Sequence, residues 1–330
     1  RRMNRLLQGD VGAGKTLVAL MAALVAVEAG GQAVLMAPTE ILARQHARAL
    51  EPLARAAGVR LAALTGRDRR DLRGQILTDL ADGTIDILVG THAVFQKDVT
   101  FHDLRLAIID EQHRFGVAQR LELSAKGDVP PDMLIMTATP IPRSLALSQY
   151  GDLDLSVLDE KPPGRQPITT VMIADTRLDQ VTDRLRAAMA QGARAYWVCP
   201  LVEESEVTDL TAAEARFTHL RAIFGDRVRL IHGQMPPDQR DAAMADFADG
   251  TAQLLVATTV IEVGVDVPQA TIMVIERAES FGLAQLHQLR GRVGRGAGAS
   301  TCLLMYHGPL NETGARRLTT LRDTEDGFRI

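Results

Sequence analysis

The sequence predicts an α/β protein made of two tandem lobes, each a mostly parallel sheet with helices on both faces. Short apolar runs alternate with longer amphipathic stretches along the chain, which is the pattern of βαβ units. The 330 residues exceed one typical domain. Three prolines and a glycine within 159–167 interrupt the hydrophobic patterns of both strands and helices. We therefore expect lobes at 1–160 and 168–330, joined by a linker at 161–167.

The alternation predicts the order of the elements within each lobe. In the first lobe, the expected strands are 5–8, 33–37, 60–64, 85–89, 104–109 and 133–137, and the expected helices are 15–29, 40–57 and 69–81. In the second lobe, the expected strands are 170–173, 193–200, 228–231, 253–257, 272–275 and 301–306, and the expected helices are 177–191, 212–224, 237–248 and 283–293.

A glycine-rich segment after the first strand fits the pattern G-x-x-x-x-G-K-[ST], which is that of the phosphate-binding P-loop. Its residues are Gly9, Asp10, Val11, Gly12, Ala13, Gly14, Lys15 and Thr16. Such glycines let backbone N–H groups surround phosphate oxygens, and the following helix points its positive end at the same anion. Lys15 can reach the β- and γ-phosphates, and Thr16 can bind Mg²⁺. The segment predicts that a nucleoside triphosphate binds, but not what its energy is used for.

Two acids follow the strand expected at 104–109. Asp110 and Glu111 then lie at the carboxyl edge of a parallel sheet, where ligands of α/β proteins bind. Asp110 is expected to hold Mg²⁺, and Glu111 to accept a proton from the attacking water.

The second strong motif is Q-L-R-G-R-V-G-R at 288–295. A helix that ends in glycines can project Arg292 and Arg295 toward a phosphate, and guanidinium groups stabilise charge on a transferring phosphoryl group. The structural alternative is a solvated basic helix end, which the helix dipole favours.

Weaker motifs also end predicted strands. Pro38-Thr39 and Gly90-Thr91-His92 precede expected helices, and helix N-terminal N–H groups and hydroxyls are good ligands for a nucleic-acid backbone. A loop with Gly264 and Asp266 is a candidate ribose or phosphate contact. The turn T-A-T-P at 137–140 is either a relay of the γ-phosphate state or an ordinary capped helix start.

Composition excludes several classes of function. The net charge is −4 and neither half has an excess of basic residues, so nucleic-acid contact has to come from local groups. Aromatic residues are only 4%, which argues against a base-stacking platform.

No apolar run is long enough to predict a membrane span. Both cysteines, Cys199 and Cys302, are expected to be buried inert thiols. The histidines at 46, 102, 219 and 307 are interpreted as surface or core fillers.

In order along the chain, the P-loop, A-P-T-E, G-T-H, D-E-Q-H, T-A-T-P, T-T-V-I-E-V-G-V-D and Q-L-R-G-R-V-G-R resemble motifs I to VI of superfamily 2 helicases. Longer stretches, among them I-D-E-Q-H-R-F-G-V, M-T-A-T-P-I-P-R and Y-G-D-L-D-L-S, look like the RecG family. These are bacterial ATP-dependent DNA helicases that remodel stalled forks and Holliday junctions.

The resemblance implies two RecA-like lobes with ATP in the cleft, and roles for the motif residues. Lys15, Thr16, Asp110 and Glu111 would act on phosphate, Mg²⁺ and water. Gln288, Arg292 and Arg295 would complete the site from the second lobe, with Arg295 as the transition-state finger. Contacts to ribose or phosphate would come from Gly264 and Asp266, and contacts to the DNA backbone from Pro38, Thr39, Gly90, Thr91 and His92.

The resemblance also implies a biological setting. We expect a protein of DNA repair and recombination in the bacterial cytoplasm, associated with the nucleoid. We further expect a monomer that acts on branched DNA and has no membrane association, with single-stranded-DNA-binding protein as a candidate partner.

Two alternatives stay open. Transcription-repair coupling factors share much of this pattern, although they usually read D-E-E-H where Gln112 stands. In addition, no counterpart of the family's N-terminal wedge domain, adenine-contacting segment or C-terminal helical hairpin is recognised, and both ends look cut from a longer protein. The chain could therefore bind nucleotide and DNA without productive unwinding.

Overall fold

The chain divides into two compact units, Arg1–Lys161 and Pro162–Ile330. The structure is a computed structural model, and it describes residues 2–9, 12–66, 68–110, 130–137, 153–159, 166–200, 206–258, 267, 269–294, 296 and 298–324. The linker expected at 161–167 stays a prediction, because most of it lies outside the described residues.

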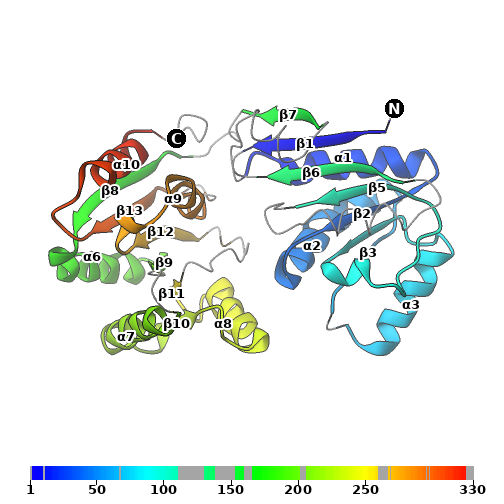
Figure 1. Ribbon diagram of the computed structural model, residues 1–330. Helices are drawn as coiled ribbons and strands as arrows, with labels where there is room; N and C mark the ends of the chain where they lie inside the picture. Colours follow the sequence, from blue (N-terminus) through cyan, green and yellow to red (C-terminus); the bar gives the residue numbers. More distant parts are fainter. Residues whose placement is uncertain are drawn as a thin grey trace. The chain divides into compact units, whose positions relative to one another are not determined.

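The first unit is built on a seven-stranded sheet in the order β3-β4-β2-β5-β6-β1-β7. Its strands are β1 (Asn4–Gly9), β2 (Gln32–Met36), β3 (Leu61–Leu64), β4 (Ile87–Gly90), β5 (Leu104–Ile109), β6 (Asp132–Thr137) and β7 (Asp154–Leu158). All neighbouring strands are parallel (Figure 1). Their carboxyl ends therefore lie along one edge of the sheet, which is where the predicted site residues follow.

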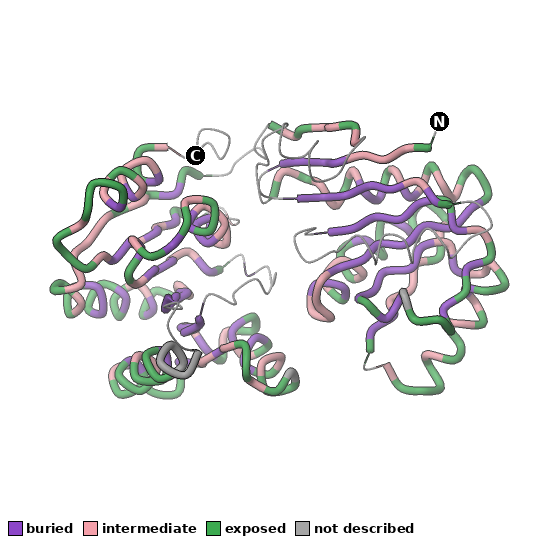
Figure 2. The backbone as a smooth tube through the Cα atoms, in the orientation of Figure 1, coloured by how far each residue is buried: buried purple, intermediate pink, exposed green. Residues whose placement is uncertain are grey.

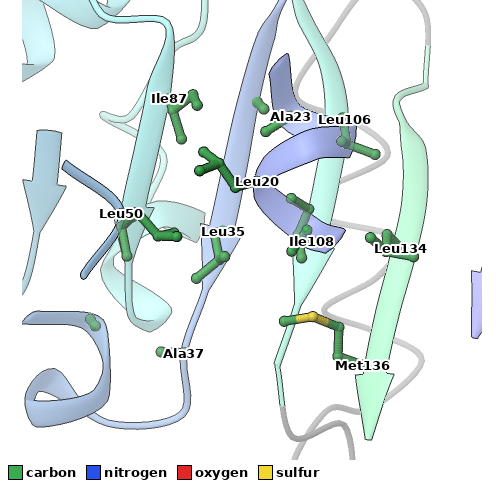
Figure 3. Packing of buried hydrophobic residues seen from close by; sticks show 14 of the residues in the cluster. Leu20, Ala23, Leu35, Ala37, Leu50, Ile87, Leu106, Ile108, Leu134 and Met136 are labelled. Atoms are coloured by element: carbon green, nitrogen blue, oxygen red, sulfur yellow. The ribbon is translucent and has the colours of Figure 1, made fainter. Parts of the chain in front are cut away.

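Helices cover both faces of this sheet because its strands are apolar on both sides. The helical elements are α1 (Lys15–Glu28), α2 (Glu40–Ala56), α3 (Arg70–Ala81) and the 3₁₀ turn η1 (His92–Phe95). On one face, Leu20 of α1 and Leu50 of α2 pack with Leu35 and Ile108 from the strands (Figure 3). On the other face, α3 and η1 pack against the alternate strand residues.

The second unit has a six-stranded sheet in the order β10-β11-β9-β12-β13-β8, again with all neighbours parallel. Its strands are β8 (Ile168–Ala174), β9 (Arg194–Cys199), β10 (Val228–Ile231), β11 (Leu254–Thr258), β12 (Ala270–Ile275) and β13 (Ser300–Tyr306). Its helices are α6 (Leu178–Ala190), α7 (Glu206–Phe224), α8 (Pro237–Asp249), α9 (Leu283–Arg290) and α10 (Glu312–Asp323), with 3₁₀ turns η3 (Asp175–Arg177), η4 (Gly225–Arg227) and η5 (Ala278–Ser280).

Neighbouring residues of β9 show how this second sheet is covered. Trp197 packs in one cluster with residues of α6 and α7. Tyr196, which points to the opposite face, packs on Phe247 of α8, with ring centroids 4.9 Å apart. Helices therefore cover both faces, and the predicted fold class is confirmed for each unit. Figure 2 shows the inner strands of both sheets as mostly buried, whereas the edge strands β7 and β8 are mostly intermediate or exposed.

Among the strands and α-helices that the structure describes, two were not predicted. The short edge strand β7 has the mixed sequence D-L-S-V-L and is only partly buried, so it lacks the continuous apolar run of the other strands. The helix α10 is polar and contains Gly314, both of which weaken a helix prediction. Its N-terminus is nevertheless capped, because the Asn311 side chain accepts a hydrogen bond from Gly314 N at 2.7 Å.

Some predicted boundaries were wrong. Helix α7 begins at Glu206 rather than residue 212, and α9 ends at Arg290 rather than residue 293, since Gly291 caps it. The helix expected after Thr91 is only the four-residue turn η1. Within the described residues, no helix is long and apolar enough to cross a membrane.

Candidate active site

The P-loop joins β1 to α1 in the first unit. Gly12 and Gly14 have φ values of 84° and 91°, in the left-handed region where a side chain would be strained. Gly9 is needed for a different reason, since an added Cβ would lie 3.0 Å from the Leu158 Cβ of β7. Asp10 and Val11 lie outside the described residues. The glycines of the motif thus have backbone and packing causes visible in the fold.

The N-terminus of α1 is arranged as an anion site. It has no side-chain cap and no acidic residue in its first turn, whereas α2 has the Thr39 cap and Glu40. Nothing in its first turn therefore competes with a phosphate for the positive end of the helix. Both Lys15 and Thr16 are partly buried in this turn, and Lys15 Nζ donates to Gly9 O at 2.7 Å.

Asp110 directly follows β5 on the same sheet edge. Its backbone N donates to Met36 O at 2.9 Å, which holds the residue beside the end of β2. Only β6 lies between β5 and the strand that enters the P-loop. The last residue of β6, Thr137, is buried and pairs with Gln8 of β1. Glu111 and residues 138–140 lie outside the described residues.

His46 was interpreted as a surface or core filler, and the structure gives it a polar partner on this sheet edge. It lies on α2, and its Nε2 is 2.8 Å from Asp110 Oδ2, with both side chains 12% exposed. A signal for it was present in the sequence, because His46 falls on the i, i+4 stripe of Leu42, Leu50 and Ala54, which are buried. A polar residue within such a stripe needs a buried partner, although the sequence does not say which one.

The predicted DNA-contacting residues end strands β2 and β4, which are neighbours. Thr39 Oγ1 accepts from Leu42 N at 3.3 Å, so its hydroxyl caps α2. Thr91 is 9% exposed and stands at the N-cap position of η1 without a side-chain cap hydrogen bond, while His92 is exposed. Gly90 has no room for a side chain, since an added Cβ would lie 2.5 Å from Leu64 O. These residues, with Pro38, thus share one sheet edge.

The end of β3 joins this edge and was missed from the sequence. Thr65 Oγ1 accepts from Arg44 Nη2 at 2.9 Å, and Thr65 N donates to Asp68 Oδ2 at 2.6 Å. The signal that could have found this loop is one that its neighbours share, a threonine within three residues after the end of a strand.

In the second unit, Gln288 lies in α9 and Arg292 in the turn after it, both partly buried. Arg292 N donates to Leu289 O at 3.1 Å, which keeps the turn close to the helix end. Gly294 follows with φ 78°. Arg295, Gly264 and Asp266 lie outside the described residues, so their predicted roles stay predictions.

Arg290 is a residue of the same motif to which the sequence assigned no role. It is 2% exposed, and its Nη1 donates to the carbonyl oxygens of Leu321 and Thr324 at the end of α10. Its Nη2 is 3.1 Å from His287 Nδ1. Arg290 thus holds α9 and α10 together.

Comparisons with known proteins find helicase domains in both units. Residues 1–147 match the DEAD/DEAH box helicase family, and residues 177–297 match the helicase conserved C-terminal domain. The chain is 54% identical over 333 residues to the ATP-dependent DNA helicase RecG of Escherichia coli O157:H7, covering 99% of this chain and 48% of the relative. It is 50% identical over 331 residues to that of Bacillus subtilis, covering 100% and 48%.

A solved structure of RecG bound to a three-way DNA junction is similar to the whole chain. The TM-score is 0.86 at 42% identity, with coverage of 100% of this chain and 43% of that chain. The chain spans about half the length of the curated relatives it matches. The chain therefore carries two helicase domains and is homologous to RecG helicases along its whole length.

Proposed function

We propose that this chain is the ATP-driven DNA motor region of a RecG-type helicase, which remodels branched DNA in recombination and repair. The observation that carries the proposal is the meeting of a P-loop and Asp110 at one sheet edge. Its relatives bear the RecG name, which favours this function over that of a transcription-repair coupling factor.

The first unit has the groups needed to bind a nucleoside triphosphate. The uncapped N-terminus of α1 and the glycines that precede it offer backbone N–H groups that donate to phosphate oxygens. Lys15 exchanges its bond to the Gly9 carbonyl for the phosphates, a stronger, charge-assisted contact. Thr16 and Asp110 supply hard oxygen ligands, which is the donor chemistry that Mg²⁺ requires. Mg²⁺, when bound, neutralises charge on the phosphate oxygens. Glu111 orients and deprotonates the attacking water.

The second unit supplies the remaining catalytic groups in this proposal. Arg292 and Arg295 contribute guanidinium charge to the transferring phosphoryl group, with Arg295 as the finger and Gln288 beside them. Gly264 and Asp266 contact the ribose or phosphate. Lobe closure around ATP and opening after hydrolysis would then reset the grip on DNA.

DNA is held by backbone donors rather than by bulk positive charge. The edge that carries Pro38, Thr39, Gly90, Thr91 and His92 offers loop N–H groups and hydroxyls to phosphates. Because Thr39 Oγ1 already caps α2, we assign the contact at that position to the backbone. A branched substrate is proposed because a similar RecG structure is bound to a three-way DNA junction.

The setting follows from the same family. We propose that the protein acts as a monomer in the bacterial cytoplasm, on nucleoid DNA, and that single-stranded-DNA-binding protein is a partner. Size-exclusion chromatography of the chain tests the oligomeric state, and the same measurement with that partner added tests complex formation.

The assignment is tested by removing the phosphate ligand and the water base separately. Lys15→Ala and Glu111→Gln should each lower DNA-stimulated ATP hydrolysis by on the order of 100-fold or more, because each removes a group on the reacting phosphate or water. Lys97→Ala removes an exposed lysine of the same unit and should leave turnover at saturating DNA unchanged. Wild-type turnover in either active-site variant would contradict the proposed function.

A further inference from the structure

His46 and Asp110 form a contact that the proposed mechanism does not yet use. Asp110 Oδ2 lies 2.8 Å from His46 Nε2, and each side chain is 12% exposed. An ionised carboxylate can only accept hydrogen bonds, so the imidazole Nε2 is the donor. Among the described residues, this is the hydrogen bond that the structure gives the carboxylate of Asp110.

We propose that His46 is a positioning residue of the ATPase site. Its Nε2–H holds Oδ2 of Asp110 in one orientation and leaves Oδ1 as the oxygen for the metal. The inference rests on the proposed function, since it concerns a carboxylate assigned to Mg²⁺. It adds a residue from α2, an element that the helicase motifs place on the DNA side rather than on the nucleotide side.

The geometry favours a positioning role over a purely structural one. Helix α2 is already fixed to the sheet by the apolar side chains of Leu42, Ala43, Leu50 and Ala54, all buried. A fifth apolar residue at position 46 would continue that stripe without the cost of burying a polar group. An imidazole is therefore not needed to attach α2, but it is needed to donate to the carboxylate.

The backbone of Asp110 is anchored independently of the histidine. Its N donates to Met36 O at 2.9 Å, so the main chain at the end of β5 is set by the sheet. What remains free is rotation of the carboxylate about its side-chain torsions, which the His46 bond removes. Hydrogen bonds of this kind to a ligating carboxylate orient the ligand, and their loss typically weakens metal affinity by roughly 10- to 100-fold.

Four substitutions separate positioning from packing. His46→Leu removes the donor and keeps an apolar side chain on the stripe. His46→Gln keeps an N–H at about the reach of Nε2, whereas His46→Asn keeps a similar amide that is too short. His219→Ala removes an exposed histidine of the second unit and serves as the control.

The measurement is the affinity of each variant for a fluorescent ADP analogue. It is determined over a series of Mg²⁺ concentrations and again in EDTA. In His46→Leu and His46→Asn, the Mg²⁺ concentration that gives half of the increase in nucleotide affinity should rise by roughly 10- to 100-fold. The nucleotide affinity in EDTA should be unchanged. His46→Gln should stay close to wild type, as should His219→Ala. If His46→Leu does not fold, the comparison of Gln with Asn still decides the question.

Several results would overturn the inference. A wild-type Mg²⁺ dependence in His46→Leu would show that the histidine only packs. Equal behaviour of the Gln and Asn variants would show that reach to Oδ2 does not matter. Loss of affinity in EDTA as well would show that the P-loop itself was damaged. If the wild-type protein shows no Mg²⁺-dependent nucleotide binding, it is the proposed function that fails.

Discussion

Cys199 and Cys302 lie in β9 and β13 and are 2% and 0% exposed. Burial raises the pKa of the Cys302 thiol to about 12. Burial also raises the pKa of the Cys199 thiol above its ordinary range, with the negative charge of Glu276 as a second cause. Since the thiolate is the reactive form, both residues are chemically inert in the folded chain, as their apolar sequence surroundings indicated.

Thiol labelling tests this burial directly. At mildly alkaline pH, the native chain should react with a chromogenic disulfide reagent at neither cysteine, because both thiols are protonated and covered. In concentrated guanidinium chloride both should react at once. Rapid labelling of one thiol in the native chain would show that its strand opens, and mass spectrometry would identify which strand it is.

Single residues differ in how far the sequence predicts them. Lys15 and Asp110 were found because each sits at a fixed distance from its own strand, and the strand ends decide where the side chain lies. His46 was missed because its partner is 64 residues away, and a lone histidine on a helix carries no sign of which group it meets. Local patterns thus predict where candidate ligands lie, whereas contacts between distant elements become visible only in the fold.

At the level of elements, the parallel strands were predictable because burial on both faces gives each of them a continuous apolar run. Strand β7 and helix α10 were not predicted for the opposite reason, because each carries polar residues and is held in place by a neighbouring element. β7 pairs with β1, and α10 is held by Arg290 of α9. Elements at the border of a fold are specified by contacts that their own sequence does not show.

The Arg290 bridge gives a prediction for the second unit. Arg290→Met leaves the Leu321 and Thr324 carbonyl oxygens without their donor, and an unsatisfied buried group costs about 1–3 kcal/mol. The free energy of unfolding should therefore fall by on the order of 2 kcal/mol. The fluorescence of Trp197 reports this unit alone, because Trp197 is the single tryptophan and lies in its core.

Arg316→Met is the matched control for the bridge. It replaces an exposed arginine of α10 and should change the free energy of unfolding by less than about 0.5 kcal/mol. Equal urea midpoints for the two variants would contradict the account of Arg290 as the residue that holds α10 to α9.

For the whole molecule, each unit builds its own sheet and its own core, and each carries part of the predicted chemistry. The first unit has the P-loop and Asp110, and the second has Gln288 and Arg292. The order of the motifs along the sequence was enough to predict which unit carries each motif. Nothing in a sequence reports the distance between two separately folded units, so the joint action of these groups has to be tested by function.

The central claim is that DNA controls ATP hydrolysis by this chain. The most direct measurement is the steady-state rate of ATP hydrolysis by the chain, with and without a model DNA fork, and with Lys15→Ala as the blank. We predict a weak rate without DNA, a higher rate with the fork and a decline of the stimulation as salt rises, since phosphate contacts hold the DNA. A rate that is the same with and without DNA, or that persists in Lys15→Ala, would contradict the account.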